Sequence, residues 1–261
     1  MKHIRIISVL TLIILFTSCR TGKNMQREIQ AIRSNLYYEL STPEYLEEIA
    51  DTIYLNFIDY SNIDYYTTVK KAKTIIVPLV IFNYSWEKFN VTLGEGSLTQ
   101  TYREFLTEAL LVESNSSTCF TLRDNVANMA PDSAYIFNVK ILHNRTSSAI
   151  KLNNMLVFLC LGDYSDFIFN FENYTVIPAI TDLRINVRLT KGKDCLLEKN
   201  YFAYHKSNYT RGKSKDSFLA NEICINNMTE SLSVATKKIV ENMTEELHLL
   251  MLQNLIHRPL P

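Results

Sequence analysis

Glycine is scarce in this sequence, and neither sign of charge is in excess. Only 6 Gly occur among 261 residues, about a third of the roughly 7% usual in proteins, which leaves little material for the glycine-rich loops that hold phosphates. The 27 Lys and Arg balance the 27 Asp and Glu, and no run of like charges suggests a nucleic-acid surface. The composition therefore argues against nucleotides and nucleic acids as partners.

The motifs of common hydrolases and zinc proteins are also absent. The sequence has no G-x-S-x-G nucleophile elbow, no H-E-x-x-H motif and no C-x-x-C pair, so nothing indicates a catalytic triad or a zinc module. Adjacent carboxylates such as Glu245 and Glu246 point apart on a helix and cannot share a substrate. We therefore expect a protein that is not an enzyme and that binds no metal or other cofactor.

The N-terminus has the pattern of an export signal. Basic residues precede an apolar run from Ile6 to Phe16, as in the n-region and h-region of a secretory signal peptide. The run has only 11 residues, whereas a membrane-spanning helix needs about 20. Residues 1–18 are therefore predicted to be a signal peptide, and no later apolar stretch is long enough to span a membrane.

The end of this segment, Leu15-Phe16-Thr17-Ser18-Cys19, resembles the relaxed lipobox of lipoproteins from Bacteroidota. The resemblance implies that Cys19 becomes the acylated first residue and anchors the chain to the outer membrane. Residues 20–23 are Arg-Thr-Gly-Lys and lack the acidic stretch of surface-exported lipoproteins, which favours the periplasmic face. In the alternative interpretation, Cys19 is simply the first cysteine of a secreted protein.

An excess of N-x-S/T sequons supports that alternative, a secreted or surface glycoprotein that acts as a binding module. About 3.6 sequons are expected by chance from the Asn, Ser and Thr content, and the sequence has more than twice as many. They lie at Asn83, Asn90, Asn115, Asn144, Asn173, Asn208, Asn227 and Asn242.

Four further cysteines follow the first. Cys119, Cys160, Cys195 and Cys224 would be exposed to an oxidising compartment and permit three complete disulfide pairings, which the sequence does not rank. Buried free thiols or a single disulfide are the other possibilities.

The pattern of apolar residues predicts an α+β fold with one domain over residues 51–257, preceded by a lipidated and helical tether over residues 19–50. Short helices are expected at 24–38 and 43–50, a helix at 98–113 that begins with a Ser97–Gln100 capping box, and a long C-terminal helix at 217–254 that Asp216 caps. Because that last helix would be longer than a small sheet is wide, we expect a break near Asn226-Asn227. Between Gly94 and Ser97, free backbone N–H groups could hold an anion, but capping is the favoured interpretation.

Strands account for most of the remaining signal. They are expected at residues 53–57, 74–84, 118–122, 135–141, 155–161, 167–171 and 183–189, with a turn at 144–148 and a hairpin through Lys191-Gly192-Lys193-Asp194 to residues 195–204. The run at 74–84 is apolar on nearly every residue, which is typical of a strand covered on both faces, although Pro78 indicates an edge or a bulge. The elements together predict a two-layer sandwich, in which a mixed, mostly antiparallel sheet packs against the middle helix and the C-terminal helix.

This order of a lipidated Cys, strand, helix, antiparallel strands and final helix is similar to that of periplasmic auxiliary lipoproteins of lipopolysaccharide-assembly and ABC-type lipid-transport systems. The resemblance implies a lipid-anchored accessory protein that docks onto an envelope partner or holds an amphipathic ligand. Fold order alone does not fix function.

One group of residues is a candidate ligand site. Phe167, Phe169 and Phe171 fall on one face of a predicted strand, where an aromatic row could contact acyl chains or stack on sugars. Such a row at period two is more often the core face of a strand, and we weigh that interpretation above the site.

Overall fold

The computed structural model describes residues 24–40, 51–57, 60, 62–77, 80–125, 130–131, 133–160, 166–207 and 213–256. The signal peptide, Cys19 and the helix expected at 43–50 lie outside these ranges and stay predictions. A helix at residues 24–31 comes first. The elements that follow are β1 (Thr52–Phe57), β2 (Tyr65–Val77), β3 (Val80–Thr92), the 3-10 helix η1 (Glu95–Ser97), α2 (Tyr102–Ser117), β4 (Thr121–Asp124), β5 (Tyr135–Cys160), β6 (Asp166–Lys191), β7 (Asp194–Lys206), β8 (Lys213–Ser214) and α3 (Ser217–Ile256).

Two long antiparallel strands organise the sheet. β5 and β6 have 26 residues each and pair from Tyr135↔Lys191 to Cys160↔Asp166, a length of about 86 Å at 3.3 Å per residue. At one end, the free edge of β5 pairs with β1 in parallel, β1 pairs with β4, and β7 adds to the edge of β6. At the other end, β5 pairs with β3 and β3 with β2.

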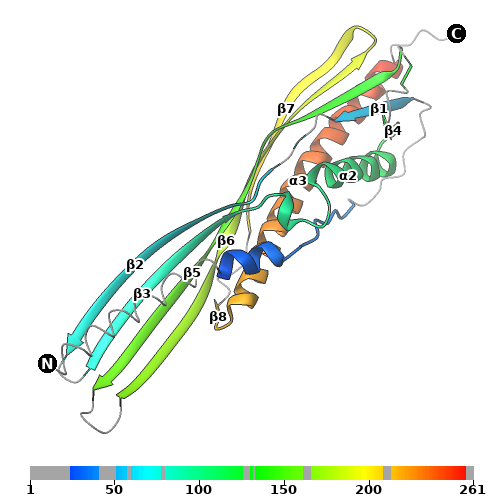
Figure 1. Ribbon diagram of the computed structural model, residues 1–261. Coiled ribbons are helices and arrows are strands. Elements are labelled where there is room, and N and C mark those ends of the chain that lie inside the picture. Colours follow the sequence, from blue (N-terminus) through cyan, green and yellow to red (C-terminus); the bar gives the residue numbers. More distant parts are fainter. Residues whose placement is uncertain are drawn as a thin grey trace.

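The sheet therefore has two parts that share β5 and β6. We call the strands β4-β1-β5-β6-β7 the body, and the strands β2-β3-β5-β6 the arm, which takes residues 147–160 of β5 and 166–177 of β6. The arm projects past the helices as a curved, twisted ribbon (Figure 1).

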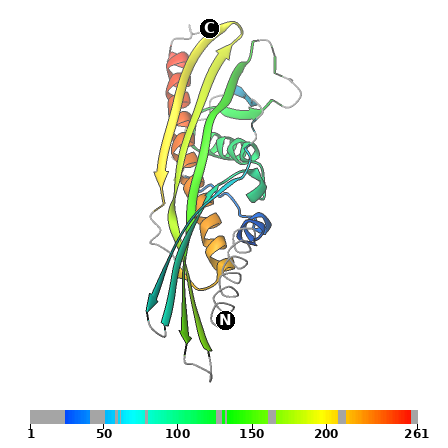
Figure 2. The ribbon, with the colours of Figure 1, turned by 60° about the vertical axis from the view of Figure 1, so that its left-hand side comes forward.

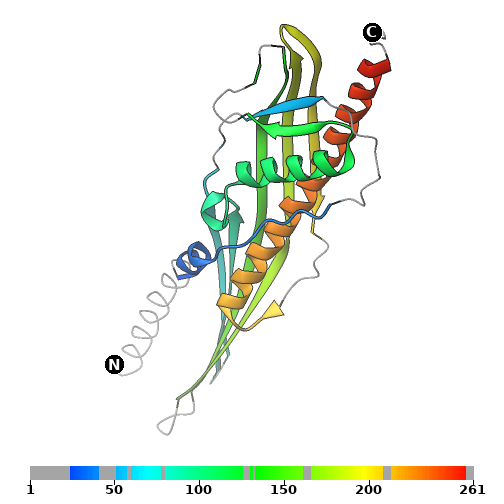
Figure 3. The same cartoon turned by 90° about the vertical axis from the view of Figure 1, so that its right-hand side faces the viewer.

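Helices cover one face of the sheet (Figures 1 and 3). α3 runs along β6 and β7 for about 60 Å, given its 40 residues at 1.5 Å each, and α2 lies beside it. One continuous core joins the helix at 24–31, α2, α3 and the sheet. These features confirm the expected α+β architecture with a mostly antiparallel sheet, a middle helix and a long C-terminal helix.

The break expected in the last helix near Asn226-Asn227 does not occur, because α3 is continuous from Ser217 to Ile256. The expectation assumed a small sheet, whereas β5 and β6 are longer than the helix. Asn227 is buried, and the Oδ1 atom of Asn226 accepts a hydrogen bond of 3.0 Å from the Ser34 hydroxyl. These asparagines therefore face tertiary contacts within an uninterrupted helix.

Several predicted boundaries are also wrong. The residues from 144 to 148 continue through β5 instead of forming a turn, and the single strand expected at 74–84 is instead the ends of β2 and β3, with Pro78 outside the described residues. The helix expected at 24–38 ends at residue 31. Ile32 and Leu36, the last apolar residues of the expected helix, are buried in the core from non-helical chain. The capping box of α2 is formed by Thr101 and Glu104, four residues later than predicted. The β6–β7 hairpin is confirmed, with Gly192 at φ 58°, in the left-handed region that glycine favours.

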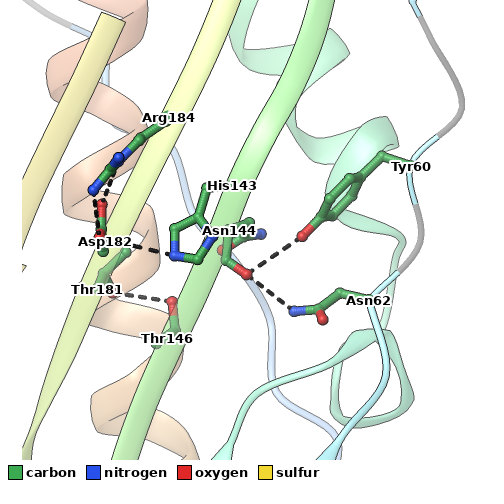
Figure 4. A network of polar contacts seen from close by, with 8 residues as sticks. All are labelled: Tyr60, Asn62, His143, Asn144, Thr146, Thr181, Asp182 and Arg184. Atoms are coloured by element: carbon green, nitrogen blue, oxygen red, sulfur yellow. Dashed lines mark hydrogen bonds and ion pairs between the residues drawn. The ribbon is translucent and has the colours of Figure 1, made fainter.

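The body and the arm meet at a polar junction on β5 (Figure 4). Between the end of the β1 pairing and the start of the β3 pairing, residues 140–146 have no strand partner on that edge. Tyr60 and Asn62 each donate a side-chain hydrogen bond of 3.3 Å to the Asn144 carbonyl oxygen, and the Leu93 N–H donates to the Thr146 carbonyl at 2.8 Å. The β1–β2 connection and the residue after β3 thus supply the donors that a neighbouring strand would otherwise provide.

The segment from Gly94 to Ser97, which follows β3, binds a side-chain carboxylate of the same chain. The Gly94 N–H donates to Asp64 Oδ1 at 2.6 Å, and the Ser97 hydroxyl donates to the same oxygen at 3.1 Å. A Cβ at position 94 would overlap the backbone of Asp64 and Ile63. The expectation that these residues only cap a helix is therefore replaced by a role in fastening the start of β2.

We predict that Gly94→Ala lowers the free energy of unfolding by about 1–3 kcal/mol, as expected for a methyl group forced against fixed backbone. Urea denaturation of the purified protein measures the change. A loss below about 0.3 kcal/mol would show that the segment yields easily and does not fasten β2.

An ion pair links the far end of α3 to β7. Lys199 Nζ and Tyr201 Oη lie 2.5 Å and 2.6 Å from Glu246 Oε2. Burial raises the pKa of Glu246, but the two hydrogen bonds and the lysine charge outweigh it and hold the pKa below its ordinary value. The charged form of Glu246 is therefore favoured by folding.

A group whose folded pKa is depressed adds stability above its unfolded pKa, and this stability is lost as the pH falls through the folded value. We predict that Glu246→Gln costs about 0.5–1 kcal/mol at pH 7 and that this cost is lost as the pH falls through the lowered pKa of Glu246. Glu245→Gln, one residue away and exposed, is the matched control and should change little at either pH. An effect of Glu246→Gln that is constant from pH 7 to pH 3 would contradict the charge assignment.

Candidate binding surface at the end of the arm

The arm has one covered face and one open face. Alternate residues of its strands join the core under the helices and include Phe89, Ile150, Leu152 and Val176; we call this the helix-side face. The residues between them in each strand point to the opposite side of the sheet and form what we call the outer face. β8 pairs with Tyr174 and Thr175, and α3 begins three residues after β8, so the helical layer starts at that level and the strands continue beyond it (Figure 2).

Two rows of side chains across the four strands form an apolar patch on the outer face. Both rows follow directly from the strand register, and their members are exposed or half-buried. We call these residues the apolar patch. The first row is Ile75, Phe82, Val157 and Phe169, and the second row is Tyr84, Met155 and Phe171. Lys73 lies at the β2 end of the second row and is not counted in the patch.

The phenylalanines predicted from the sequence lie in this patch. Phe169 is 45% exposed and Phe171 is 55% exposed, so the favoured interpretation of this row as a core face is wrong for these two residues. The Phe167 side chain is outside the described residues. Phe169 and Phe171 pair directly with Val157 and Met155 of β5, which sequence analysis did not connect with them.

A bulge in β6 explains why Phe169 and Phe171 face outward. The register with β5 shifts between Ile180 and Ile177, at Pro178, where a missing N–H is tolerated. Even-numbered residues such as Val176 are buried before the bulge, whereas odd-numbered residues such as Leu183 and Leu189 are buried after it. Without this bulge the phenylalanines would point toward the helices.

The apolar character extends around the end of the arm. On the helix-side face, Ile76 is 75% exposed, and Ile81 and Leu156 are half-buried. Soluble monomers rarely leave contiguous apolar patches of this kind uncovered, and such patches mark interaction sites. The run at 74–84 predicted a strand covered on both faces; its described side chains are instead exposed or half-buried on both faces.

Lysines and the single tryptophan adjoin the apolar patch on the outer face. Trp86 lies in the next row, with Lys71 Nζ 5.7 Å and Lys151 Nζ 5.4 Å from its ring centroid. Lys88 lies beside Lys151 in the row after that. An ion pair between Lys70 and the buried Glu87, at 2.6 Å, lies on the other face.

No three His, Cys, Asp or Glu side chains of the described part of the chain approach a common metal position. A pocket of about 820 Å³ lies between the end of β1 and α2, lined by Phe57, Tyr60 and the exposed side of α2. Its charged residues include Glu104, whose carboxylate is used in the capping box with Thr101.

Three of the four later cysteines are free thiols. Cys119 and Cys224 are buried and Cys195 is exposed, so none of these three is paired with another, and the Cys160 side chain is outside the described residues. Burial raises the pKa of Cys224 to about 12, and burial also raises the pKa of Cys119. Both buried thiols therefore stay protonated at neutral pH and are poor nucleophiles.

Two sequons lie at positions where a glycan would require local unfolding. Asn227 is buried in α3, and the Asn115 side chain exchanges two hydrogen bonds with the backbone of Leu122, of 2.8 Å and 3.3 Å. Asn173, by contrast, is exposed on the arm. The folded structure therefore disfavours a glycan at Asn115 and Asn227 and leaves Asn173 open to one.

No described helix is long and apolar enough to cross a bilayer.

Comparisons with known proteins add little to this geometry. No model of a known protein family matches the sequence, and no curated protein matches it either. Among solved structures, the chain is similar to the crystal structure of protein XCC0632 from Xanthomonas campestris, of the DUF330 family. The TM-score is 0.43 at 8% sequence identity, covering 85% of this chain and 97% of that one. The function must therefore be inferred from the residues of this chain.

We predict that Phe169→Ala and Phe171→Ala each lower the free energy of unfolding by less than about 1 kcal/mol, because both rings are already in contact with water. Ile150→Ala, a fully buried position in the same arm, is the comparison and should cost about 2–5 kcal/mol. Urea denaturation measures all three variants. Equal losses would mean that the apolar patch is part of a core.

Proposed function

We propose that the protein is a non-enzymatic accessory protein of the bacterial cell envelope, anchored by an acylated Cys19 on the periplasmic face of the outer membrane. The body and its helices serve as a scaffold, and the arm carries the binding surface. The apolar patch supports this proposal: a sheet that leaves seven apolar side chains open to water on a projecting arm needs a ligand or partner that covers them.

The position of the N-terminal helix is compatible with such an anchor. Met25 and Ile29 are buried in the core, and Glu28 accepts a hydrogen bond of 2.8 Å from Asn221 in the second turn of α3. The helix at 24–31 is thus fixed against the end of α3 that lies next to the arm. An acyl group on Cys19, five residues before Asn24, would be held within about 18 Å of this point.

The anchor has a direct test in the native host. Wild-type protein is expected in the membrane fraction, with an N-terminal mass that includes acyl chains on Cys19, and Cys19→Ala is expected to lose both the mass and the firm attachment. Cys195→Ala, an exposed thiol in the body, is the control and should change neither. An unmodified Cys19, together with glycans on the sequons, would contradict the lipoprotein and favour the secreted glycoprotein.

The binding role of the arm is tested by crosslinking in cells. A photoreactive residue in place of Phe171 is expected to capture a specific lipid or envelope protein, whereas the same residue in place of Tyr204, which is exposed on β7 of the body, is not. Capture that is equal at both positions, or absent at position 171, would contradict the assignment of the arm as the binding surface.

A further inference from the structure

We propose that the outer face of the arm lies on a lipid bilayer that contains anionic headgroups. The inference rests on the proposed function in taking the arm as the binding surface, and it identifies the partner of that surface. Three observations carry it: the apolar patch, the lysines next to it and the position of Trp86.

The charges on the outer face are all positive. Lys71, Lys73, Lys88 and Lys151 point to this side in the strand register, although the chain as a whole is neutral. Every residue of β2, β3 and the arm segments of β5 and β6 that alternates onto this face lacks a carboxylate. Within the described residues, none of these four lysines forms an ion pair. Their ammonium groups are therefore available to anionic headgroups.

The aromatic and apolar residues are arranged as at a membrane surface. Trp86 shares its row with Lys71, between the row of Lys88 and Lys151 and the apolar patch, and Tyr84 is in the adjacent row. Trp and Tyr favour the headgroup level, where the ring is partly apolar and one end is polar. From the Lys71 row to the Ile75 row is four residues, or about 13 Å along the strand. A contact tilted along the strands, with the end of the arm deeper, would thus place lysines and Trp86 among headgroups and the apolar patch at the acyl boundary, the level at which amphipathic surfaces bind.

A second copy of the chain is a less suitable partner. Two outer faces brought together would set eight lysines against one another with no carboxylate between them, which is unfavourable when water is excluded. An anionic bilayer neutralises the same lysines. The arm also lies at the same end of the helical layer as the helix at 24–31 (Figures 1 and 2), so a bilayer that holds Cys19 is within reach of the outer face.

Trp86 is the single tryptophan of the chain, so its fluorescence reports on this surface alone. The test uses the full mature chain, residues 19–261, as Cys19→Ala, so that no acyl chain contributes. It is mixed with vesicles of phosphatidylcholine and phosphatidylglycerol at about three to one, and with vesicles of phosphatidylcholine only. We expect co-sedimentation and a blue shift of the Trp86 emission with the anionic vesicles, and at least about tenfold weaker binding to the neutral ones or in high salt.

Two sets of variants separate the contributions. Lys71→Gln/Lys88→Gln/Lys151→Gln should weaken binding to anionic vesicles about a hundredfold. Phe169→Ser/Phe171→Ser should abolish the blue shift. The matched control replaces three exposed lysines of the body and should bind as the unsubstituted chain does, because it changes the net charge equally. Its substitutions are Lys140→Gln, Lys193→Gln and Lys206→Gln.

Failure to bind vesicles, or binding that the arm and body variants weaken equally, would overturn the inference. Dimers that form through the outer face, detected by light scattering and lost in Phe169→Ser/Phe171→Ser, would overturn it in favour of a second copy. Either result leaves the proposed function standing if the crosslinker at position 171 still captures a specific partner in cells. The two proposals therefore fail separately.

Discussion

The pairing of β5 with β6 along their whole length is the constraint on which the rest of this structure depends. Because the two strands run side by side from Tyr135 to Cys160 and back to Lys191, the body and the arm are parts of one sheet and cannot be placed independently. The same length gives α3 a surface along which 40 helical residues pack without a break. It also carries the end of the arm beyond the reach of the helices, since no described helix covers the strands past β8.

The two register shifts give this long ladder its functional asymmetry. One lies at Leu142 in β5 and the other at Pro178 in β6, and each changes which set of alternate residues faces the helices. In the body, the core face is made by residues such as Phe137 and Val187, and in the arm by Ile150 and Val176. The aromatic residues that precede Pro178 in β6 are consequently directed away from the core, so that the fold itself produces the apolar patch.

Local signals were enough to predict much of the body. The stripe of α3, the Asp216 cap, which accepts a 2.9 Å hydrogen bond from the Phe218 N–H, and the hairpin at Gly192 each depend on neighbours in sequence. The arm was not predictable in this way. Aromatic residues at every second position, such as Phe169 and Phe171, give the same sequence pattern whether their face of the strand is buried or exposed. The apolar run through Pro78 likewise gives no sign that it belongs to two strands. Only the partners across the sheet, far apart in sequence, decide these points.

Two methionines offer the most direct test of the central claim that the end of the arm is open to water in the free protein. Met155 lies in the apolar patch and is 39% exposed, whereas Met243 is fully buried in α3. Peroxide treatment of the native protein, followed by peptide mass spectrometry, measures the rate of sulfoxide formation at each. The account predicts that Met155 is oxidised at least about tenfold faster than Met243, because only its sulfur is accessible. Equal slow rates would mean that Met155 is buried and would contradict the account of an exposed arm.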